Sequence, residues 1–315
     1  MILIFSESTD LTTTLVINNL KRKFFRFNSD EDIIEISCTI NNNKESFVLY
    51  INSGEVIINL DKVTKIWYRR GIGLRDEYAQ KLDEIFKVYF QVNATCVNNY
   101  FFELVSGKTI GSYSKEMEVN KVLNLSIARE SDILVPPTKI TSSKKDLEGF
   151  LKIHKRLVIK PLKHPFSFEK GSKIVTPSSG ILVFDNLIDF PDKFSLSLFQ
   201  KYIEKKFEVR VFFIEHEYYA FAIFSQSNKG AELDFRDGNQ KLLRTVPYNL
   251  SNDMIKKLKE MQKKMNLNTG SIDIVVDNKS NFYFLEVNPS GQFLSFSENN
   301  NCYLENRVRH YLEQK

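Results

Sequence analysis

The amino-acid sequence predicts an α/β protein with two or three domains or subdomains, and three observations support this fold class. A chain of 315 residues, 42% of them hydrophobic, can bury a full core. Short apolar runs typical of strands alternate with longer stretches that have helical spacing. Residues 270–293 contain two apolar runs separated by a polar turn, which indicates a β-hairpin.

The N-terminal third of the chain predicts strands and helices in alternation. Residues 2–5, a polar-capped helical stretch at 11–23, and residues 24–28 suggest a βαβ unit, the start of an α/β domain. Strand-like runs follow at 33–40, 46–51 and 65–68. Residues 74–105 then read mostly as helix.

Helical spacing returns at residues 115–130. The apolar stripe of this predicted helix consists of Val119, Val122, Leu123 and Ile127. Asn120 and Lys121 fall outside the stripe, and Pro136 and Pro137 end the unit.

Two more helices are predicted towards the C-terminus. The first follows Ser251, and its apolar face consists of Met254, Ile255, Leu258, Met261 and Met265. Such a methionine stripe is more typical of core packing than of a cofactor site. The second spans residues 304–312.

The predicted hairpin carries a set of oxygen ligands. Asp273 lies in its first apolar run, and Glu286 and Asn288 lie in the second. Side chains at positions i and i+2 of a strand share one face, so Glu286 and Asn288 point the same way. Carboxylates and an amide oxygen suit Mg²⁺, which completes its coordination with water and substrate phosphates. An equally simple interpretation is a half-buried hairpin whose acidic residues are merely exposed.

A second group of charged residues favours the metal interpretation. Lys160 ends the short apolar run that begins at residue 157, and Glu208 and Arg210 occupy positions i and i+2 of an apolar strand. A polyphosphate requires cations that offset its charge and metal ions that bridge its oxygens. A lysine, an arginine and a metal set on separate strands therefore predict a polyphosphate ligand.

Composition disfavours several classes of protein. No run of about 18 apolar residues predicts a membrane span, and the N-terminus lacks the basic region of a signal peptide. Cys38, Cys96 and Cys302 have no metal-type spacing, so we expect reduced thiols in a cytoplasmic protein. Residues 144–173 hold nine Lys and Arg against three Asp and Glu, but no nucleic-acid-binding motif accompanies them. We expect neither a nucleic acid nor a membrane as partner.

Catalytic signatures are absent or incomplete. Residues 106–109 read Ser-Gly-Lys-Thr, like the end of a P-loop, but the glycine required earlier in the motif is Phe102, so we assign the segment no nucleotide role. No GxSxG elbow, HExxH helix or CxxC pair occurs. The histidines are scattered, at positions 154, 164, 216 and 310. The sequence therefore offers no signature of an enzyme nucleophile.

Six segments, in the same order, resemble the ATP-grasp superfamily, and most closely the ATP-grasp peptide maturases of the microviridin and grasp-with-spasm type. These enzymes crosslink ribosomally made peptides. The segments are residues 67–71, 197–200, 206–210, 222–226, 234–236 and 267–293. The resemblance implies an α/β ATP-grasp fold, in which two α+β subdomains grip ATP, preceded by an α/β N-terminal domain. The implied boundaries are 1–114 for the N-terminal domain, 115–196 for subdomain A with its lid, and 197–315 for subdomain B with the metal-binding hairpin.

The resemblance also implies roles for individual residues. The ATP-binding residues would be Lys121 and Lys160 at the phosphates, Gln200, Lys201, Tyr202 and Ile203 at the adenine, and Glu208 at the ribose. The catalytic residue would be Arg210, which meets the γ-phosphate and the acyl phosphate. The Mg²⁺ ligands would be Asp273, Glu286 and Asn288, and the substrate-binding residues Asp234 and Arg236.

The chain departs from the family pattern in two segments. Related ligases carry an asparagine shortly after the substrate-binding arginine, where this chain has Asp237, which puts the acceptor chemistry in doubt. Residues 162–172 occupy the place of a glycine-rich lid but contain a single glycine, Gly171. The lid would then be stiffer, or would bind the peptide itself.

The implied activity is ATP-dependent crosslinking of a precursor peptide that has a leader and a core. Asp and Glu side chains would be activated as acyl phosphates and joined to Ser or Thr hydroxyls or Lys amines, giving ω-ester or ω-amide macrocycles. The implied cofactors are ATP and Mg²⁺, and the resemblance allows a homodimer. A docked leader holds the core peptide at high effective concentration. We expect it at residues 165–183 or 67–70, although Trp67 itself is more typical of a core residue.

Two other functions remain open at this point. One is a carboxylate–amine ligase of the same fold that acts on a small molecule or a protein tail, as a glutamate-adding enzyme does. The other is a non-catalytic module that binds a peptide or a nucleotide. The intact set of Lys160, Arg210, Asp273, Glu286 and Asn288 argues against the second.

Overall fold

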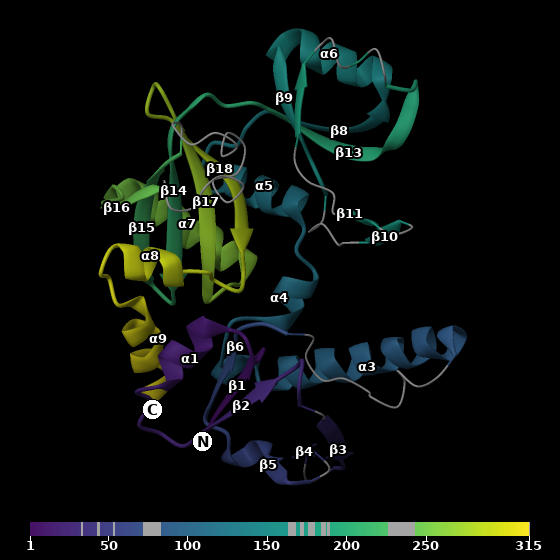
Figure 1. The fold of residues 1–315 in the computed structure, drawn as a ribbon, viewed down its shortest axis with the longest axis vertical. Coiled ribbons are helices and arrows are strands. Elements are labelled where there is room, and N and C mark those ends of the chain that lie inside the picture. The colour runs from purple at the N-terminus through teal and green to yellow at the C-terminus, as the bar shows by residue number, and fades with distance from the viewer. Residues whose placement is uncertain are drawn as a thin grey trace. The chain divides into compact units, whose positions relative to one another are not determined.

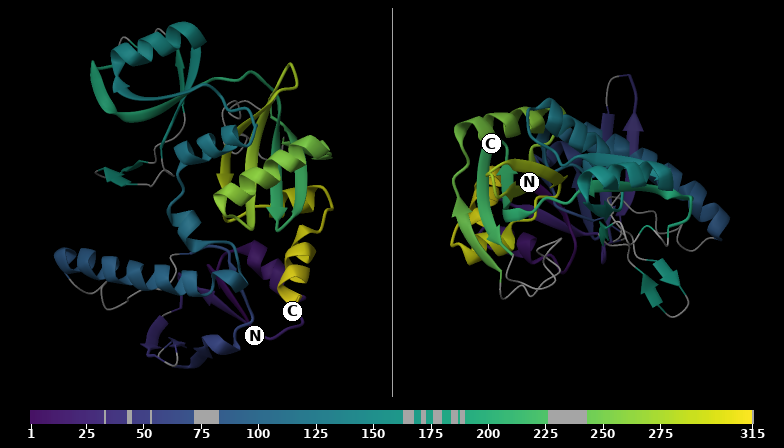
Figure 2. Two further views of the ribbon diagram at one scale, coloured as in Figure 1. Left: turned by 180° about the vertical axis from the view of Figure 1, so that it is seen from behind. Right: turned by 90° about the horizontal axis from the view of Figure 1, so that it is seen from above.

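The computed structural model describes residues 1–32, 34–42, 45–52, 54–71, 83–162, 168–170, 173–175, 180–183, 187, 190–225 and 243–314. The chain forms two compact units, whose helices and strands are labelled in Figure 1 and seen from two further sides in Figure 2. Unit 1 consists of Met1–Glu118, Leu267–Gly270 and Pro289–Lys315, and unit 2 of Val119–Asn266 and Ser271–Asn288. None of the helices in the described ranges is long and apolar enough to cross a membrane.

The parallel sheet of unit 1 confirms the predicted βαβ unit. β1 (Ile2–Ser6) pairs in parallel with β2 (Phe24–Asn28) on one side and with β6 (Lys65–Tyr68) on the other. β7 (Thr109–Ile110) extends the sheet beside β6. α1 (Leu11–Ile17) is shorter than predicted, because two asparagines, which favour a helix only weakly, follow Ile17.

An antiparallel sheet and several helices complete unit 1. The sheet contains β3 (Ile34–Ile40), β4 (Glu45–Ile51) and β5 (Val56–Asn59), of which the sequence did not predict β5. The helical elements are η1 (Leu60–Lys62), α3 (Glu84–Leu104), η2 (Ser106–Lys108), α4 (Tyr113–Met117), α8 (Leu294–Asn299) and α9 (Leu304–Glu313). Phe5, Phe47 and Phe101 belong to an apolar core that both sheets share with η1, α3 and α4. Trp67 is 3% exposed, so it is a core residue, as predicted.

The segment that looks like the end of a P-loop has a structural role. It forms η2, and Lys108 Nζ donates to the backbone carbonyls of Leu60 and Val63 at 3.1 and 3.0 Å. The hydroxyl of Thr109 donates to the carbonyl of Val105 at 2.7 Å. The lysine of this segment therefore holds η1 in place.

Unit 2 contains two larger sheets. The four-stranded sheet, in the order β12-β9-β13-β8, consists of β8 (Thr138–Ser143), β9 (Arg156–Lys160), β12 (Gly180–Val183) and β13 (Lys193–Lys201). The five-stranded sheet, in the order β16-β15-β14-β17-β18, consists of β14 (Lys205–Ile214), β15 (Glu217–Phe224), β16 (Arg244–Tyr248), β17 (Thr269–Asp277) and β18 (Phe282–Asn288). A small antiparallel pair is formed by β10 (Phe168–Lys170) and β11 (Lys173–Val175).

Helices cover both sheets of unit 2. α6 (Lys144–His154) packs on the four-stranded sheet, with Leu147 and Leu151 buried. α7 (Asn252–Met265) lies against one face of the five-stranded sheet in Figures 1 and 2. Met261 and Met265 are buried there, so the methionine stripe belongs to the core, as predicted.

The single helix predicted at residues 115–130 is wrong, because the structure divides it into α4 and α5 (Lys121–Glu130). Asn120 caps the second helix: its Oδ1 accepts hydrogen bonds from the amides of Val122 and Leu123 at 3.1 and 3.0 Å. Because the helix begins again at Lys121, the face of α5 that is buried differs from the predicted one. Val122 and Leu123 are exposed, and the buried side chains of α5 are Leu125 and Ala128.

Gly111 follows β7 at a position where the backbone leaves no room for a side chain. Its φ is +81°, and a Cβ built there would lie 2.1 Å from the carbonyl oxygen of Tyr68, the last residue of β6. Its amide donates to Asn268 Oδ1 at 3.0 Å. Glycine therefore permits both the turn and the close approach of the two segments.

We expect Gly111→Ala to lower the free energy of unfolding by about 3 kcal/mol, because it combines a strained φ with a backbone clash. Gly54→Ala is the matched control. Its φ is +91°, but among the described residues, its two chain neighbours aside, no atom lies within 4 Å of the added Cβ. The control should lose only about 1–2 kcal/mol of conformational strain. Urea unfolding of both variants measures the difference, and equal losses would show that the contact with Tyr68 has no effect.

Candidate active site

The acidic hairpin (residues 271–288, in β17 and β18) confirms the predicted β-hairpin. Asp273 lies directly opposite Glu286, and Ser271 lies opposite Asn288. Residues opposite each other in an antiparallel pair share a face, as do residues two apart in one strand. The side chains of Asp273, Glu286 and Asn288 therefore project from one face of the sheet, which is the arrangement that a shared metal ion requires.

Arg210 lies on β14, the strand next to β17, and forms hydrogen bonds with Asp273. Its Nη1 donates to both carboxylate oxygens of Asp273 at 2.7 Å, and the guanidinium is buried. Its Nε is also buried and has no hydrogen-bond partner among the described residues. Because a buried donor without a partner is costly, this nitrogen indicates a place for an anionic group.

Lys121 lies beside the second carboxylate of the acidic hairpin. It is the first residue of α5, and its Nζ is 3.4 Å from Glu286 Oε2. The side chains are 12% and 22% exposed, so both are only partly in contact with water. The cap at Asn120 fixes where the helix begins and thereby places this lysine.

Glu208 is the most deeply buried acid of this region. It lies two residues before Arg210 on β14, and its Oε1 accepts from Lys205 Nζ at 2.5 Å and from the Ser225 hydroxyl at 3.2 Å. Burial raises the pKa of Glu208, and the charge of Asp273 adds to the rise, whereas Lys205 and Ser225 oppose it. The sequence did not predict Lys205, since a spacing of three residues places side chains on opposite faces of a regular strand.

The hinge predicted to contact adenine, residues 200–203, begins at the end of β13, and two of its amides bond within the protein. The amide of Lys201 donates to the Pro137 carbonyl at 2.8 Å, and that of Tyr202 donates to the Arg156 carbonyl at 3.0 Å. Gln200 is buried, and its Nε2 donates to the Thr138 hydroxyl at 3.0 Å. The Gln200 side chain therefore supports the hinge from inside the protein.

Lys160, Asp234 and Arg236 complete the set of predicted site residues. Lys160 ends β9 in the four-stranded sheet, half-buried and opposite Leu198, whereas the carboxylates belong to the five-stranded sheet. Asp234 and Arg236 lie outside the described residues.

The residues of the acidic hairpin fit Mg²⁺ with a phosphate ligand. Among the described residues, no group of three or more His, Cys, Asp or Glu side chains could hold a metal ion by itself. Two carboxylates and one amide oxygen are a set that Mg²⁺ accepts when phosphate oxygens and water complete its shell. The unpaired Nε of Arg210 adds a donor for the same anion.

Two protein families match the chain, and together they span nearly all of it. The family described as "MvdD pre-ATP grasp domain" matches residues 1–116, and the family described as "RimK-like ATP-grasp domain" matches residues 119–312. No curated protein matches the chain in sequence.

Solved structures share the fold over the whole chain. The RiPP-associated ATP-grasp ligase of Chryseobacterium gregarium, in complex with ADP and a leader and core peptide, has a TM-score of 0.81 at 24% identity, over 99% of this chain and 94% of that chain. The macrocyclase MdnC of Microcystis aeruginosa MRC, bound with precursor peptide MdnA, has a TM-score of 0.79 at 23% identity, over 99% of each chain. The ATP-grasp ligase PsnB, complexed with a precursor variant, Mg and ADP, has a TM-score of 0.70 at 16% identity, over 99% and 97%.

These similarities confirm the predicted fold class, an ATP-grasp fold preceded by an α/β N-terminal domain. The match to residues 119–312 covers more than half of the 315 residues. The protein therefore belongs to the RimK-like ATP-grasp family.

Proposed function

We propose that this protein is an ATP-dependent ligase that forms macrocyclic crosslinks in a ribosomally made precursor peptide. The observation that carries the proposal is the similarity to peptide-bound ligases over 99% of the chain, N-terminal domain included. The acidic hairpin and Arg210 support it, because a carboxylate ligase must hold a metal ion and a phosphate together.

Asp273, Glu286 and Asn288 are the proposed Mg²⁺ ligands. The metal supplies, when bound, positive charge that offsets the phosphates of ATP. Lys121, which pairs with Glu286, would then turn from that carboxylate to the phosphates. Glu208 would accept from the ribose, and Lys160 would contact a phosphate. Since the amides of Lys201 and Tyr202 are already bonded, the contact with adenine falls to the hinge carbonyls and to Ile203.

The proposed reaction has two steps. A peptide Asp or Glu carboxylate attacks the γ-phosphate, and ADP leaves. A Ser or Thr hydroxyl or a Lys amine then attacks the acyl phosphate, loses its proton and displaces phosphate, so that each crosslink removes one water from the peptide. Two anions approach each other in the first step, and Arg210 stabilises the charge that develops there. Asp273 holds Nη1 of the guanidinium and leaves Nε for the phosphate.

Mass spectrometry of a candidate precursor peptide, incubated with the protein and Mg-ATP, tests the proposal. The peptide to use is the product of a neighbouring short reading frame rich in Thr and Glu or Asp. A loss of one water per crosslink is expected. An ATP-dependent gain of mass on a small molecule or a protein tail would instead favour the alternative, a glutamate-ligase-like enzyme of the same family.

Partners and location form part of the same proposal. The peptide would dock through its leader, and Arg69 is too deeply buried, at 2% exposure, to contact it.

Cys38, Cys96 and Cys302 are free thiols, which suits the proposed cytoplasmic location. The homodimer remains a prediction, which light scattering would test.

We expect Glu286→Gln to abolish dehydration of the peptide while the fold is retained, because a neutral amide neither offsets a divalent charge nor replaces a carboxylate ligand. Glu260→Gln is the matched control, since Glu260 is exposed on α7. Dehydration is followed by mass spectrometry and folding by thermal melting. Turnover at the wild-type rate in Glu286→Gln would refute the metal assignment.

We expect Arg210→Lys to weaken nucleotide binding only modestly but to slow crosslinking by about 100-fold or more, the loss typical of one missing transition-state donor. Lysine keeps the charge beside Asp273 but lacks a second nitrogen for the phosphate. Calorimetry gives the ATP affinity and mass spectrometry gives the rate. Arg129→Lys, on the exposed last turn of α5, is the control. Equal losses of affinity and rate would make Arg210 a binding residue only.

A further inference from the structure

The segments on either side of the acidic hairpin belong to unit 1. Residues 271–288 belong to unit 2, whereas the residues on either side, Leu267–Gly270 and Pro289–Lys315, belong to unit 1. The strands that carry the proposed metal ligands therefore continue into two segments of unit 1. Other residues of unit 1 form hydrogen bonds with both segments. What fixes those segments also fixes the ends of the hairpin.

Asn268 holds the segment that leads into β17. Its Oδ1 accepts from the Gly111 amide at 3.0 Å, and its Nδ2 donates to the Thr109 carbonyl at 2.7 Å. One amide side chain thus binds two backbone groups at β7. Asp273 follows five residues later, on β17.

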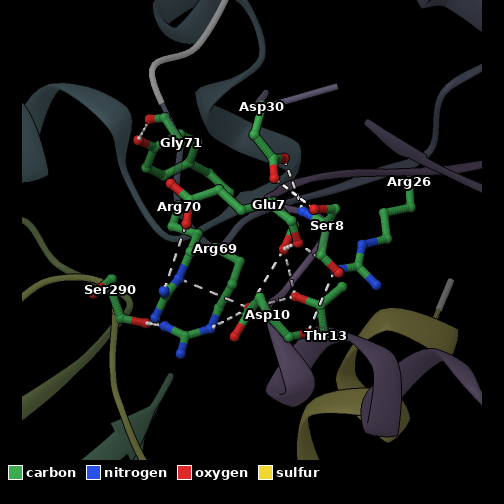
Figure 3. Close-up of polar contacts among 12 residues, drawn as sticks. Glu7, Ser8, Asp10, Thr13, Arg26, Asp30, Arg69, Arg70, Gly71 and Ser290 are labelled. Carbon is green, nitrogen blue, oxygen red and sulfur yellow. Dashed lines mark hydrogen bonds and ion pairs between the residues drawn. The ribbon is translucent and has the colours of Figure 1, made fainter. Parts of the chain in front are cut away.

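Arg69 holds the segment that leaves β18. Figure 3 shows its guanidinium between Asp10 and Ser290, with Nη1 donating to the Ser290 carbonyl at 2.7 Å and Nε 3.2 Å from Asp10 Oδ2. Asp10 is itself held by the Thr13 hydroxyl, which donates to Oδ2 at 2.7 Å. Arg69 is 2% exposed and Asp10 is 6% exposed, so both charged side chains are buried.

The anchor at Ser290 is close to a proposed metal ligand along the chain. Only Pro289 separates Ser290 from Asn288, and the proline ring restricts the backbone between them. A displacement of the Ser290 carbonyl must therefore be absorbed within very few rotatable bonds. Metal ligands depend on such supporting contacts for their orientation.

We propose that Arg69 and Asn268 are positioning residues for the metal site, because they fix the two ends of the acidic hairpin. This inference rests on the proposed role of Asp273, Glu286 and Asn288 as Mg²⁺ ligands. Neither residue touches the metal or the nucleotide in this proposal. Their effect passes through the backbone of the hairpin.

The test measures how ADP binding depends on Mg²⁺ concentration, without turnover. Arg69→Lys keeps a positive charge beside Asp10. It lacks the planar guanidinium, which contacts Asp10 and the Ser290 carbonyl at the same time. We expect the Mg²⁺ concentration at half-saturation to rise about tenfold, the usual loss when a contact supporting a metal ligand is removed. ADP affinity at saturating Mg²⁺ should stay close to the wild-type value.

Arg22→Lys is the matched control, because Arg22 also donates to a backbone carbonyl of unit 1, that of Gln314, at 3.1 Å. Melting in EDTA is measured in parallel, since a merely structural residue would lower the melting temperature and leave the Mg²⁺ dependence unchanged. That outcome for Arg69→Lys and for Asn268→Ser alike would overturn the inference. Asn268→Ser, which loses the contacts at β7, provides the same test if Arg69→Lys does not fold.

Glu286→Gln separates this inference from the proposed function. If Glu286→Gln shifts the Mg²⁺ dependence and both Arg69→Lys and Asn268→Ser leave it unchanged, the positioning role alone is wrong. If Glu286→Gln leaves the Mg²⁺ dependence unchanged, the metal assignment is wrong and the positioning role falls with it. A shift in Glu286→Gln and in either anchor variant, without a shift in Arg22→Lys, supports both.

Discussion

The ion pair between Arg210 and Asp273 is the constraint on which the candidate site depends. The two side chains are 3% and 12% exposed, and withdrawing each charge from water costs several kcal/mol. Two apolar residues of similar volume would often stabilise a sheet as well or better, whereas removing one partner alone costs about 3–5 kcal/mol. Stability therefore does not explain the pair. In the proposed function, the pair fixes a guanidinium whose Nε has no hydrogen-bond partner among the described residues and would donate to a phosphate.

The neighbouring acids follow the same arrangement, in which each carboxylate has its own cation. The pairs are Glu208 with Lys205, Asp273 with Arg210, and Glu286 with Lys121. Without these cations, carboxylates on adjacent strands would repel one another and take up protons. Burial already raises the pKa of Glu208 and the charge of Asp273 adds to the rise, whereas Lys205 opposes it. In the proposed function, Mg²⁺ and a phosphate would meet these paired charges.

Strand alternation made much of this site predictable from the sequence. Glu286 and Asn288 lie two apart, as do Glu208 and Arg210, and that spacing places each pair on one face. Contacts between distant segments leave no such periodic signal. Arg210 meets Asp273 63 residues away, and Arg69 meets Ser290 221 residues away. The break between α4 and α5 was missed for a different reason, since apolar spacing continues across the capping residue, Asn120.

Unit 1 combines residues 1–118 with residues 289–315, and this affects how the protein folds during synthesis. Lys65 Nζ lies 4.7 Å from the centre of the Tyr311 ring, and the Lys21 amide donates to Glu313 Oε1 at 2.7 Å. α9 also buries Leu304 and Leu312. The ribosome must therefore release α9 before the N-terminal sheet gains its last helix. All residues of unit 2 have been translated by then, so the domain that is translated first is the last to be completed.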